Sequence, residues 1–299
     1  MFLPLPPLLL LLALLLPGPA AAWNAHGHRL IAAIAWQQMS PSARTACSEL
    51  LARHPDHADW QRRSRSTAPE AIFSEAATWA DAIRDDPRYY DEGRDPALPP
   101  PPGLIDNRRH KHWHYVDRDV HGRRQKGELD RRSEALLHLL QDDRDSERAV
   151  WALPWLLHLI GDLHQPLHTG QAEDEGGNRI EIENPFDPRQ PFINLHSYWD
   201  NLPGRRSLRG ERLFAEAARL QAAHPPPRPG RVADWHDESR RLLRQAYPDI
   251  VGSLLPSISR DFHQRAGEQA RRRLVDAGYR LGWSLEAIFG AGVPRETAR

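Results

Sequence analysis

The densest group of residues able to bind a metal ion is the stretch His158-Leu-Ile-Gly-Asp162-Leu-His164-Gln-Pro166-Leu-His168. His158 and Asp162 are four residues apart in a segment with helical periodicity, so both side chains point from one face of a helix. Pro166 ends that helix, and the chain then turns and brings His168 back near the helix end. Imidazole and carboxylate together are good zinc ligands. Because this many polar groups between apolar runs are poorly explained as core packing, we interpret the stretch as metal-binding.

A second cluster, Asn194-Leu-His196-Ser-Tyr-Trp-Asp200, repeats this geometry. His196 and Asp200 stand one helical turn apart, and Asn194 is placed to cap the helix. Alone, the segment is equally typical of a capped surface helix whose His and Asp interact locally. Beside the first cluster, a second metal half-site is the better interpretation.

Three shorter segments add candidate ligands, although each on its own is better explained without a metal. Asp81 and Arg84 are three residues apart near a helix end, as in a surface ion pair. His112 and His114 alternate in a predicted short strand and should therefore face the same way. The three segments are Trp23–His28, Trp79–Arg84 and His112–Asp117.

The first 22 residues resemble a secretory signal peptide. Residues 1–22 carry no charged side chain, are rich in Leu between Leu8 and Leu16, and end in small residues at Ala20 to Ala22. No Lys or Arg precedes the apolar core, and a membrane anchor is the alternative. An anchor is disfavoured by the short length and by Pro4, Pro6, Pro7 and Pro17. We expect cleavage between Ala22 and Trp23, a secreted or periplasmic protein, and no membrane span in the mature chain.

Helical periodicity dominates the remaining sequence. It predicts helices over 25–38, 41–54, 68–84, 131–142, 147–165, 208–223, 231–246 and 260–289, and short strands near 113–116 and 179–182. Proline clusters at 99–102 and 225–229 mark surface loops but are too short to separate domains. We therefore predict a mainly α protein with one helical domain over 23–299, a few short strands and long loops.

Composition limits how the fold is braced and what the surface attracts. Lys plus Arg and Asp plus Glu both number 40, so any attraction to a polyanion would have to be local. Cys47 is the single cysteine, which excludes a disulfide within the chain. Bound metal is a candidate for the missing brace.

The candidate metal-binding segments, taken in order, resemble the trinuclear-zinc, single-strand-specific nucleases typified by the mould nucleases P-one and S-one. The five segments that carry the resemblance are Trp23–His28, Trp79–Asp81, Trp113–His114, His158–His168 and Asn194–Asp200. That family shares its fold and zinc cluster with bacterial zinc-dependent phospholipase C. The matching motifs span residues 23 to 201, and while each is unspecific alone, all five in sequence are highly specific. The resemblance implies three zinc ions per chain and a single helical domain of the zinc phospholipase C and single-strand nuclease type.

The resemblance also implies a role for each matched position. The first zinc would be held by Asp81, His114, His158 and Asp162. The second would share Asp162 and be bound by His28 and by the α-amino nitrogen and carbonyl oxygen of Trp23. The third would be held by His168, His196 and Asp200. The catalytic residues would be Asp81, Asp162, the phosphate-binding Arg84, and Asp117, which would orient Arg84. Asn201 would contact a base, and His164 matches no ligand.

The implied reaction is hydrolysis of single-stranded DNA and RNA by an endonuclease that leaves 5′-phosphate ends. A water between two zincs would supply hydroxide, while the third zinc and Arg84 would bind the phosphate and stabilise its developing charge. The same site could act as a 3′-nucleotidase, and no stable protein partner is implied. Two alternatives stay open, a zinc-dependent phospholipase C and a non-catalytic zinc-binding protein. The first is disfavoured because phospholipase C typically has Glu where Asp200 stands, and the second because zinc binding alone would not need Arg84.

Overall fold

The structure is a computed structural model that describes residues 23–204, 207–249 and 255–291; the predicted signal peptide lies outside the described residues. The described part is mostly helical, as the sequence predicted. Its α-helices are α1 (Ala25–Gln38), α2 (Pro41–Ala52), α3 (His57–Ser64), α4 (Pro69–Ala76), α5 (Trp79–Ala82), α6 (Leu129–Asp142), α7 (Glu147–Leu163), α8 (Leu195–Asn201), α9 (Gly210–Ala223), α10 (Val232–Ala246) and α11 (Arg260–Phe289). Three short 3₁₀ helices are η1 (Ile83–Asp85), η2 (Lys111–Trp113) and η3 (Pro166–Thr169).

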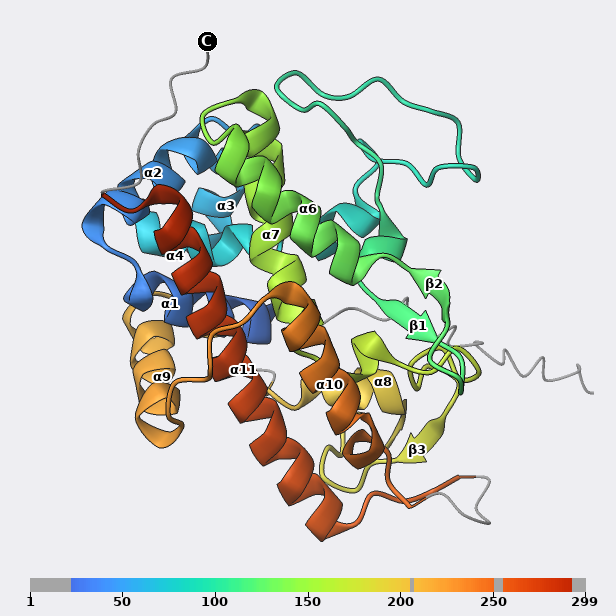
Figure 1. The fold of residues 1–299 in the computed structure, drawn as a ribbon. Helices are drawn as coiled ribbons and strands as arrows, with labels where there is room; N and C mark the ends of the chain where they lie inside the picture. Colours follow the sequence, from blue (N-terminus) through green and yellow to red (C-terminus); the bar gives the residue numbers. More distant parts are fainter. Residues whose placement is uncertain (1–22, 205–206, 250–254, 292–299) are drawn as a thin grey trace, which may run out of the picture.

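Two small antiparallel hairpins lie to one side of the helices (Figure 1). Strand β1 (Val116–Arg118) pairs with β2 (Arg124–Gly127), and β3 (Glu181–Glu183) pairs with β4 (Phe192–Asn194). Strand β1 packs against η3, and β4 leads directly into α8. The hairpins therefore contact the segments that carry His168, on η3, and His196 and Asp200, on α8.

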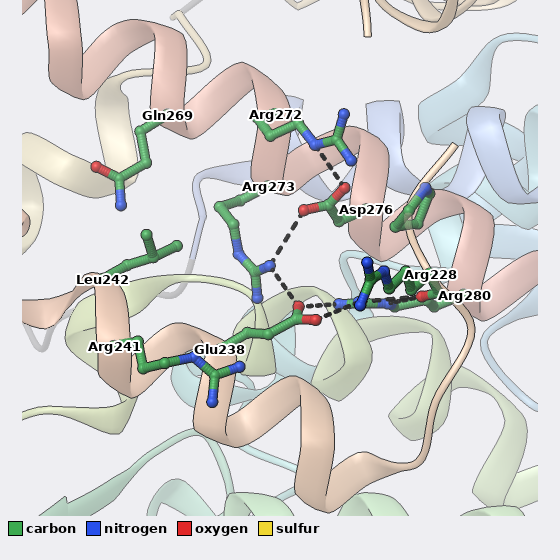
Figure 2. Close-up of a pocket in the computed structure, with 10 residues that line it drawn as sticks. Arg228, Glu238, Arg241, Leu242, Gln269, Arg272, Arg273, Asp276 and Arg280 are labelled. Atoms are coloured by element: carbon green, nitrogen blue, oxygen red, sulfur yellow. Dashed lines mark hydrogen bonds and ion pairs between the residues drawn. The ribbon is translucent and has the colours of Figure 1, made fainter. Parts of the chain in front are cut away.

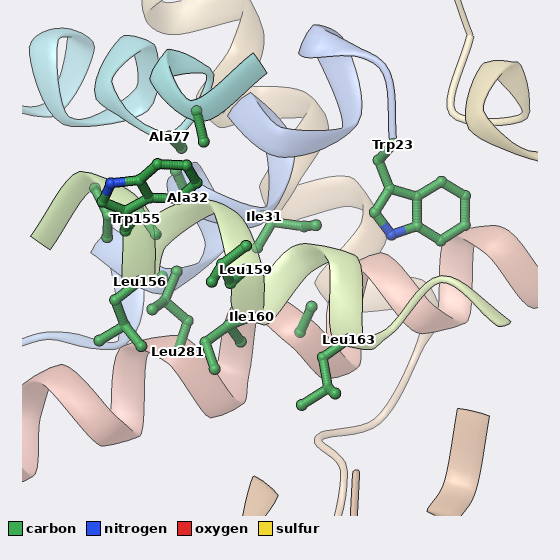
Figure 3. Packing of buried hydrophobic residues seen from close by; sticks show 14 of the residues in the cluster. Trp23, Ile31, Ala32, Ala77, Trp155, Leu156, Leu159, Ile160, Leu163 and Leu281 are labelled. Carbon is green, nitrogen blue, oxygen red and sulfur yellow. The ribbon is translucent and has the colours of Figure 1, made fainter. Parts of the chain in front are cut away.

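Helix α7 is the centre of the fold. Every residue from Ala149 to Leu163 is buried, and the helix packs against α1, α2, α5, α6, α10 and α11 (Figures 1 and 3). A helix that is apolar on all faces must be enclosed by other elements. The metal-binding candidates near its end, His158 and Asp162, consequently project into the interior of the protein.

Polar side chains fix where the main helices begin. Asn194 caps α8 as predicted, because its side-chain oxygen accepts from Ser197 N at 2.7 Å. The side chains of Asn24, Ser40, Ser146 and Ser259 cap α1, α2, α7 and α11 in the same way. In the described part of the chain, no helix combines the length and apolar character needed to cross a bilayer.

Two local predictions were wrong. The helix predicted over 68–84 is interrupted at Ala77 and Thr78, where Ala77 O bonds the Nδ1 atom of His158 from α7. The strand predicted at 113–116 begins only at Val116, and η2 precedes it. In consequence His112 and His114 do not face the same way: the side chain of His112 is 48% exposed, whereas that of His114 is 2% exposed.

Candidate metal centre

All eight side chains predicted to bind zinc lie together in three groups. Within each group the candidate ligand atoms are within 4.8 Å of one another. The groups are His28 with Asp81 and His158, His114 with His158 and Asp162, and His168 with His196 and Asp200. Tertiary packing thus unites residues of α1, α5, α7, η3, α8 and the end of η2.

Asp162 lies at the centre of the first two groups. Its Oδ2 atom is 3.0 Å from His114 Nδ1 and 3.4 Å from His158 Nε2. Its other oxygen, Oδ1, is 3.4 Å from His28 Nε2. The two carboxylate oxygens face different imidazoles, which is the arrangement expected of a carboxylate shared by two ions.

Several buried atoms of these groups lack a hydrogen-bond partner in the described structure. They are both ring nitrogens of His28, Nε2 of His114 and His158, and Oδ1 of Asp81 and Asp162. Leaving a buried polar atom unpaired costs about 1–3 kcal/mol, so native proteins rarely do so. Nitrogen and carboxylate oxygen are donors that zinc accepts, and the residues therefore fit a metal ion.

The third group shows the need for a cation most directly. The Nδ1 atom of His168 bonds the carbonyl of His114, and Nδ1 of His196 bonds the carbonyl of Gly176 at 2.7 Å. Because a carbonyl only accepts, both Nδ1 atoms carry hydrogen and both Nε2 atoms of the neutral rings present lone pairs. Those Nε2 atoms face each other at 3.0 Å, and Asp200 Oδ2 is 3.7 Å from His196 Nε2. A cation among them would remove this repulsion.

Burial prepares these groups to bind metal. It lowers the pKa of His28 to about 4 and that of His196 to about 3, which keeps both imidazoles neutral. Burial also raises the pKa of Asp200 well above its usual range. At Asp162 burial acts in the same direction, but His158, His114 and His28 outweigh it and hold the pKa well below its usual range. Metal binding requires neutral imidazoles and ionised carboxylates. A bound cation would therefore favour the ionised form of Asp200, which burial disfavours.

The comparison with known proteins agrees with this geometry. The S1/P1 nuclease family model matches residues 23–290. The chain belongs to this family. Endonuclease 4 of Arabidopsis thaliana is 30% identical over 158 residues, or 47% of this chain and 51% of the relative. Nuclease S1 of Aspergillus oryzae is 27% identical over 210 residues, 65% of this chain and 60% of the relative. Nuclease P1 of Penicillium citrinum is 27% identical over 203 residues, 64% and 62% of the two chains. The matches span about half to three-fifths of the length of these relatives.

In this S1/P1 nuclease family member, two glycines let the ligand segments approach closely. A Cβ atom at Gly161 would lie 2.9 Å from His28 Nδ1, so α7 and α1 can meet here only without a side chain. Gly176 has φ +62°, and a Cβ there would lie 2.5 Å from Leu167 O. Neither glycine was among the residues predicted to form the site.

A buried ion-pair network braces the turn between α7 and η3 (Figure 2). Arg280 donates to His164 Nε2 at 2.9 Å, and Arg273 donates to the His164 carbonyl at 3.1 Å. Glu238 of α10 bonds both arginines of α11, at 2.6 and 3.1 Å. His164 also bonds Ile160 O through Nδ1, so both its ring nitrogens are occupied by protein and it belongs to none of the three metal groups.

The remaining predicted residues occupy different positions around the centre. Arg84 Nη2 is 3.1 Å from Asp81 Oδ1, and the two side chains are 9% and 19% exposed, so solvent reaches the centre from their side. Asp117 is buried on β1, and burial raises its pKa to about 7 although the charge of Lys126 acts in the opposite direction. Its role in orienting Arg84 stays a prediction. Asn201 accepts from Asn24 Nδ2 at 3.3 Å.

The start of the described chain lies against the centre. Trp23 is fully buried, and its indole Nε1 donates to Gly161 O at 3.1 Å (Figure 3). Asn24 N donates to Asp200 O at 3.0 Å. The main chain at Trp23 is therefore held between the segments that carry Asp162 and Asp200.

Proposed function

We propose that the chain, once processed, is a zinc-dependent endonuclease that hydrolyses phosphodiester bonds of single-stranded DNA and RNA and leaves 5′-phosphate ends. The same site could also act as a 3′-nucleotidase. The opposed Nε2 atoms of His168 and His196, beside the buried carboxylate of Asp200, carry this proposal. A cation between these atoms would remove the repulsion between their lone pairs, and membership of the S1/P1 nuclease family supports zinc and phosphodiester chemistry.

Together with Trp23, the eight side chains of these groups would hold three zinc ions, although the two ions nearest Asp162 would divide the first two groups differently from the grouping by distance. Asp81, His114, His158 and Asp162 would hold the first ion. The second would share Asp162 with His28 and Trp23, and the third would be held by His168, His196 and Asp200. Zinc at these sites would lower the pKa of a bound water towards neutrality and stabilise negative charge on the phosphate.

Arg84 would bind the phosphate that is cut. Its ion pair with Asp81 fixes the guanidinium beside the metal groups, on the side open to solvent. A guanidinium can donate two parallel hydrogen bonds to phosphate oxygens, which orients the phosphate as well as attracting it. We further propose that Asp117 orients Arg84 and that Asn201 contacts a base.

We propose that export and cleavage complete the centre. The α-amino nitrogen of Trp23 can bind zinc only if the peptide bond to Ala22 is cut. Three observations support cleavage at this bond: Trp23 is buried against Gly161, Asn24 is bonded to Asp200, and the family match begins at residue 23. A secreted or periplasmic protein follows from this proposal.

The substrate preference follows from burial of the ligands. Seven of the eight side-chain ligands are buried, and only Asp81 is partly exposed. An unpaired, flexible strand can present its phosphate to such a centre more readily than a duplex can. We therefore expect faster cleavage of single strands, with little sequence preference.

A single set of assays separates this proposal from its alternatives. Purified protein beginning at Trp23 would be incubated with single-stranded DNA, RNA, duplex DNA and phosphatidylcholine, and its zinc content measured. We expect about three zincs per chain, faster cleavage of both single-stranded substrates, and 5′-phosphate products. Lipid hydrolysis exceeding nuclease activity would favour a phospholipase C, and bound zinc without hydrolysis a non-catalytic binding protein.

A further inference from the structure

We propose that Gln165 is a positioning residue that holds the carboxylate of Asp200 in its orientation towards the third metal ion. The inference rests on the proposed function, because it assumes that His168, His196 and Asp200 hold a zinc. Gln165 was not among the ligands or catalytic residues implied by the sequence. It is fully buried in the turn between α7 and η3.

The amide of Gln165 has one partner at each end. Its Oε1 atom accepts from Leu167 N at 2.6 Å, and its Nε2 atom donates to Asp200 Oδ1 at 2.9 Å. A main-chain N–H can only donate, so the atom that faces Leu167 must be the amide oxygen. The nitrogen therefore faces Asp200 and cannot exchange places with the oxygen.

The main chain of Gln165 is tied to two further ligand residues. Its N–H donates to Asp162 O at 3.0 Å, and its carbonyl accepts from His168 N at 3.1 Å. Gln165 thus contacts three predicted metal ligands. It contacts Asp162 and His168 through its main chain and Asp200 through its side chain. Few changes elsewhere in the turn could alter Asp200 so directly.

The hydrogen bond from Gln165 determines the orientation of the Asp200 carboxylate. Without it, rotation about the Cβ–Cγ bond could exchange the two oxygens. With Oδ1 held by Gln165, Oδ2 lies 3.7 Å from His196 Nε2 and Oδ1 lies 3.9 Å from His168 Nε2. Hydrogen bonds of this kind, from residues behind the ligands, typically change metal affinity 10–100-fold.

Two substitutions separate this role from simple support of the turn. Gln165→Glu keeps an oxygen for Leu167 N but replaces the donor to Asp200 with a carboxyl group. Gln165→Met keeps the length of the side chain and removes both contacts. Gln264→Glu, at an exposed position on α11, is the matched control for the added charge. His196→Ala supplies the reference titration of a protein without the third ion.

The test is zinc titration of metal-free protein by calorimetry, with the thermal melting of each metal-free variant as a control for folding. We expect both Gln165 variants to bind one of the three zincs 10–100-fold more weakly than the wild-type protein. The other two zincs should bind with wild-type affinity, and they should be the same two that His196→Ala retains. Adding Gln165→Met to His196→Ala should cause no further loss. Three zincs at wild-type affinity in Gln165→Glu would overturn the proposal, as would equal weakening of all three. Failure of the wild-type protein to bind a third zinc would instead contradict the proposed function.

Discussion

Replacing Asp162 by Asn keeps the shape of the side chain and removes its charge from the middle of the centre. The carboxylate lies within 3.4 Å of three imidazoles and is fully buried. Since Asp162 would serve two ions, the variant should bind one zinc in place of three and lose most of its activity. Asp142→Asn, at an exposed position near the end of α6, is the matched control.

The metal-free protein should also lose stability in this variant. Asp162 and Asp81 outweigh the effect of burial and raise the pKa of His158, so His158 forms a buried ion pair with Asp162. Breaking a buried ion pair costs about 3–5 kcal/mol, and we expect the lower end because His158 can release its proton in the variant. A loss of about 3 kcal/mol corresponds to a fall in Tm of roughly 6–12 °C for a chain of this size. Calorimetry of metal-free wild type and variant would measure it.

The difference in stability between metal-free wild type and Asp162→Asn should depend on pH in a definite direction. The folded protein holds the pKa of Asp162 well below that of an unfolded aspartate, about 3.9. Its contribution to stability is therefore fully present above about pH 5 and is lost as pH falls towards the folded pKa. The gap between wild type and Asp162→Asn should be largest near pH 5 to 6 and close below about pH 4. It should narrow again as pH rises through the pKa of His158, which Asp162 and Asp81 raise against the effect of burial. Full zinc content in the variant, or equal metal-free stability near pH 6, would refute the reasoning.

Three further predictions follow from the same centre. Arg84→Ala should lower turnover of single-stranded DNA while elemental analysis still finds the wild-type zinc content; loss of zinc would make Arg84 structural. A protein with one extra Met before Trp23 should lose one zinc and most activity but keep its circular dichroism spectrum, and unchanged activity would exclude the α-amino group as a ligand. Chelation should lower Tm by roughly 8–16 °C for each site filled at 1,000 times its Kd, because such binding contributes about 4 kcal/mol; an unchanged Tm would contradict the metal sites.

Most helices could be predicted from the sequence because apolar periodicity lies within the helical segment itself. The apolar periodicity of 147–165 and 260–289 predicted α7 and α11 to within two residues. The break in the helix predicted over 68–84 could not be read in this way. At the break, Ala77 O accepts a hydrogen bond from Nδ1 of His158, a residue 81 positions away in sequence.

The sequence by itself determined which residue types could bind metal and that they occur in an order typical of one nuclease family. Spacing within a helix also placed His158 beside Asp162 and His196 beside Asp200, because one helical turn fixes such neighbours. Only the tertiary structure decided that the two pairs and the segment at Trp23 lie together. It also decided the roles of Gln165 and Gly176, since a hydrogen bond to Asp200 or a close approach to Leu167 depends on where distant segments pack.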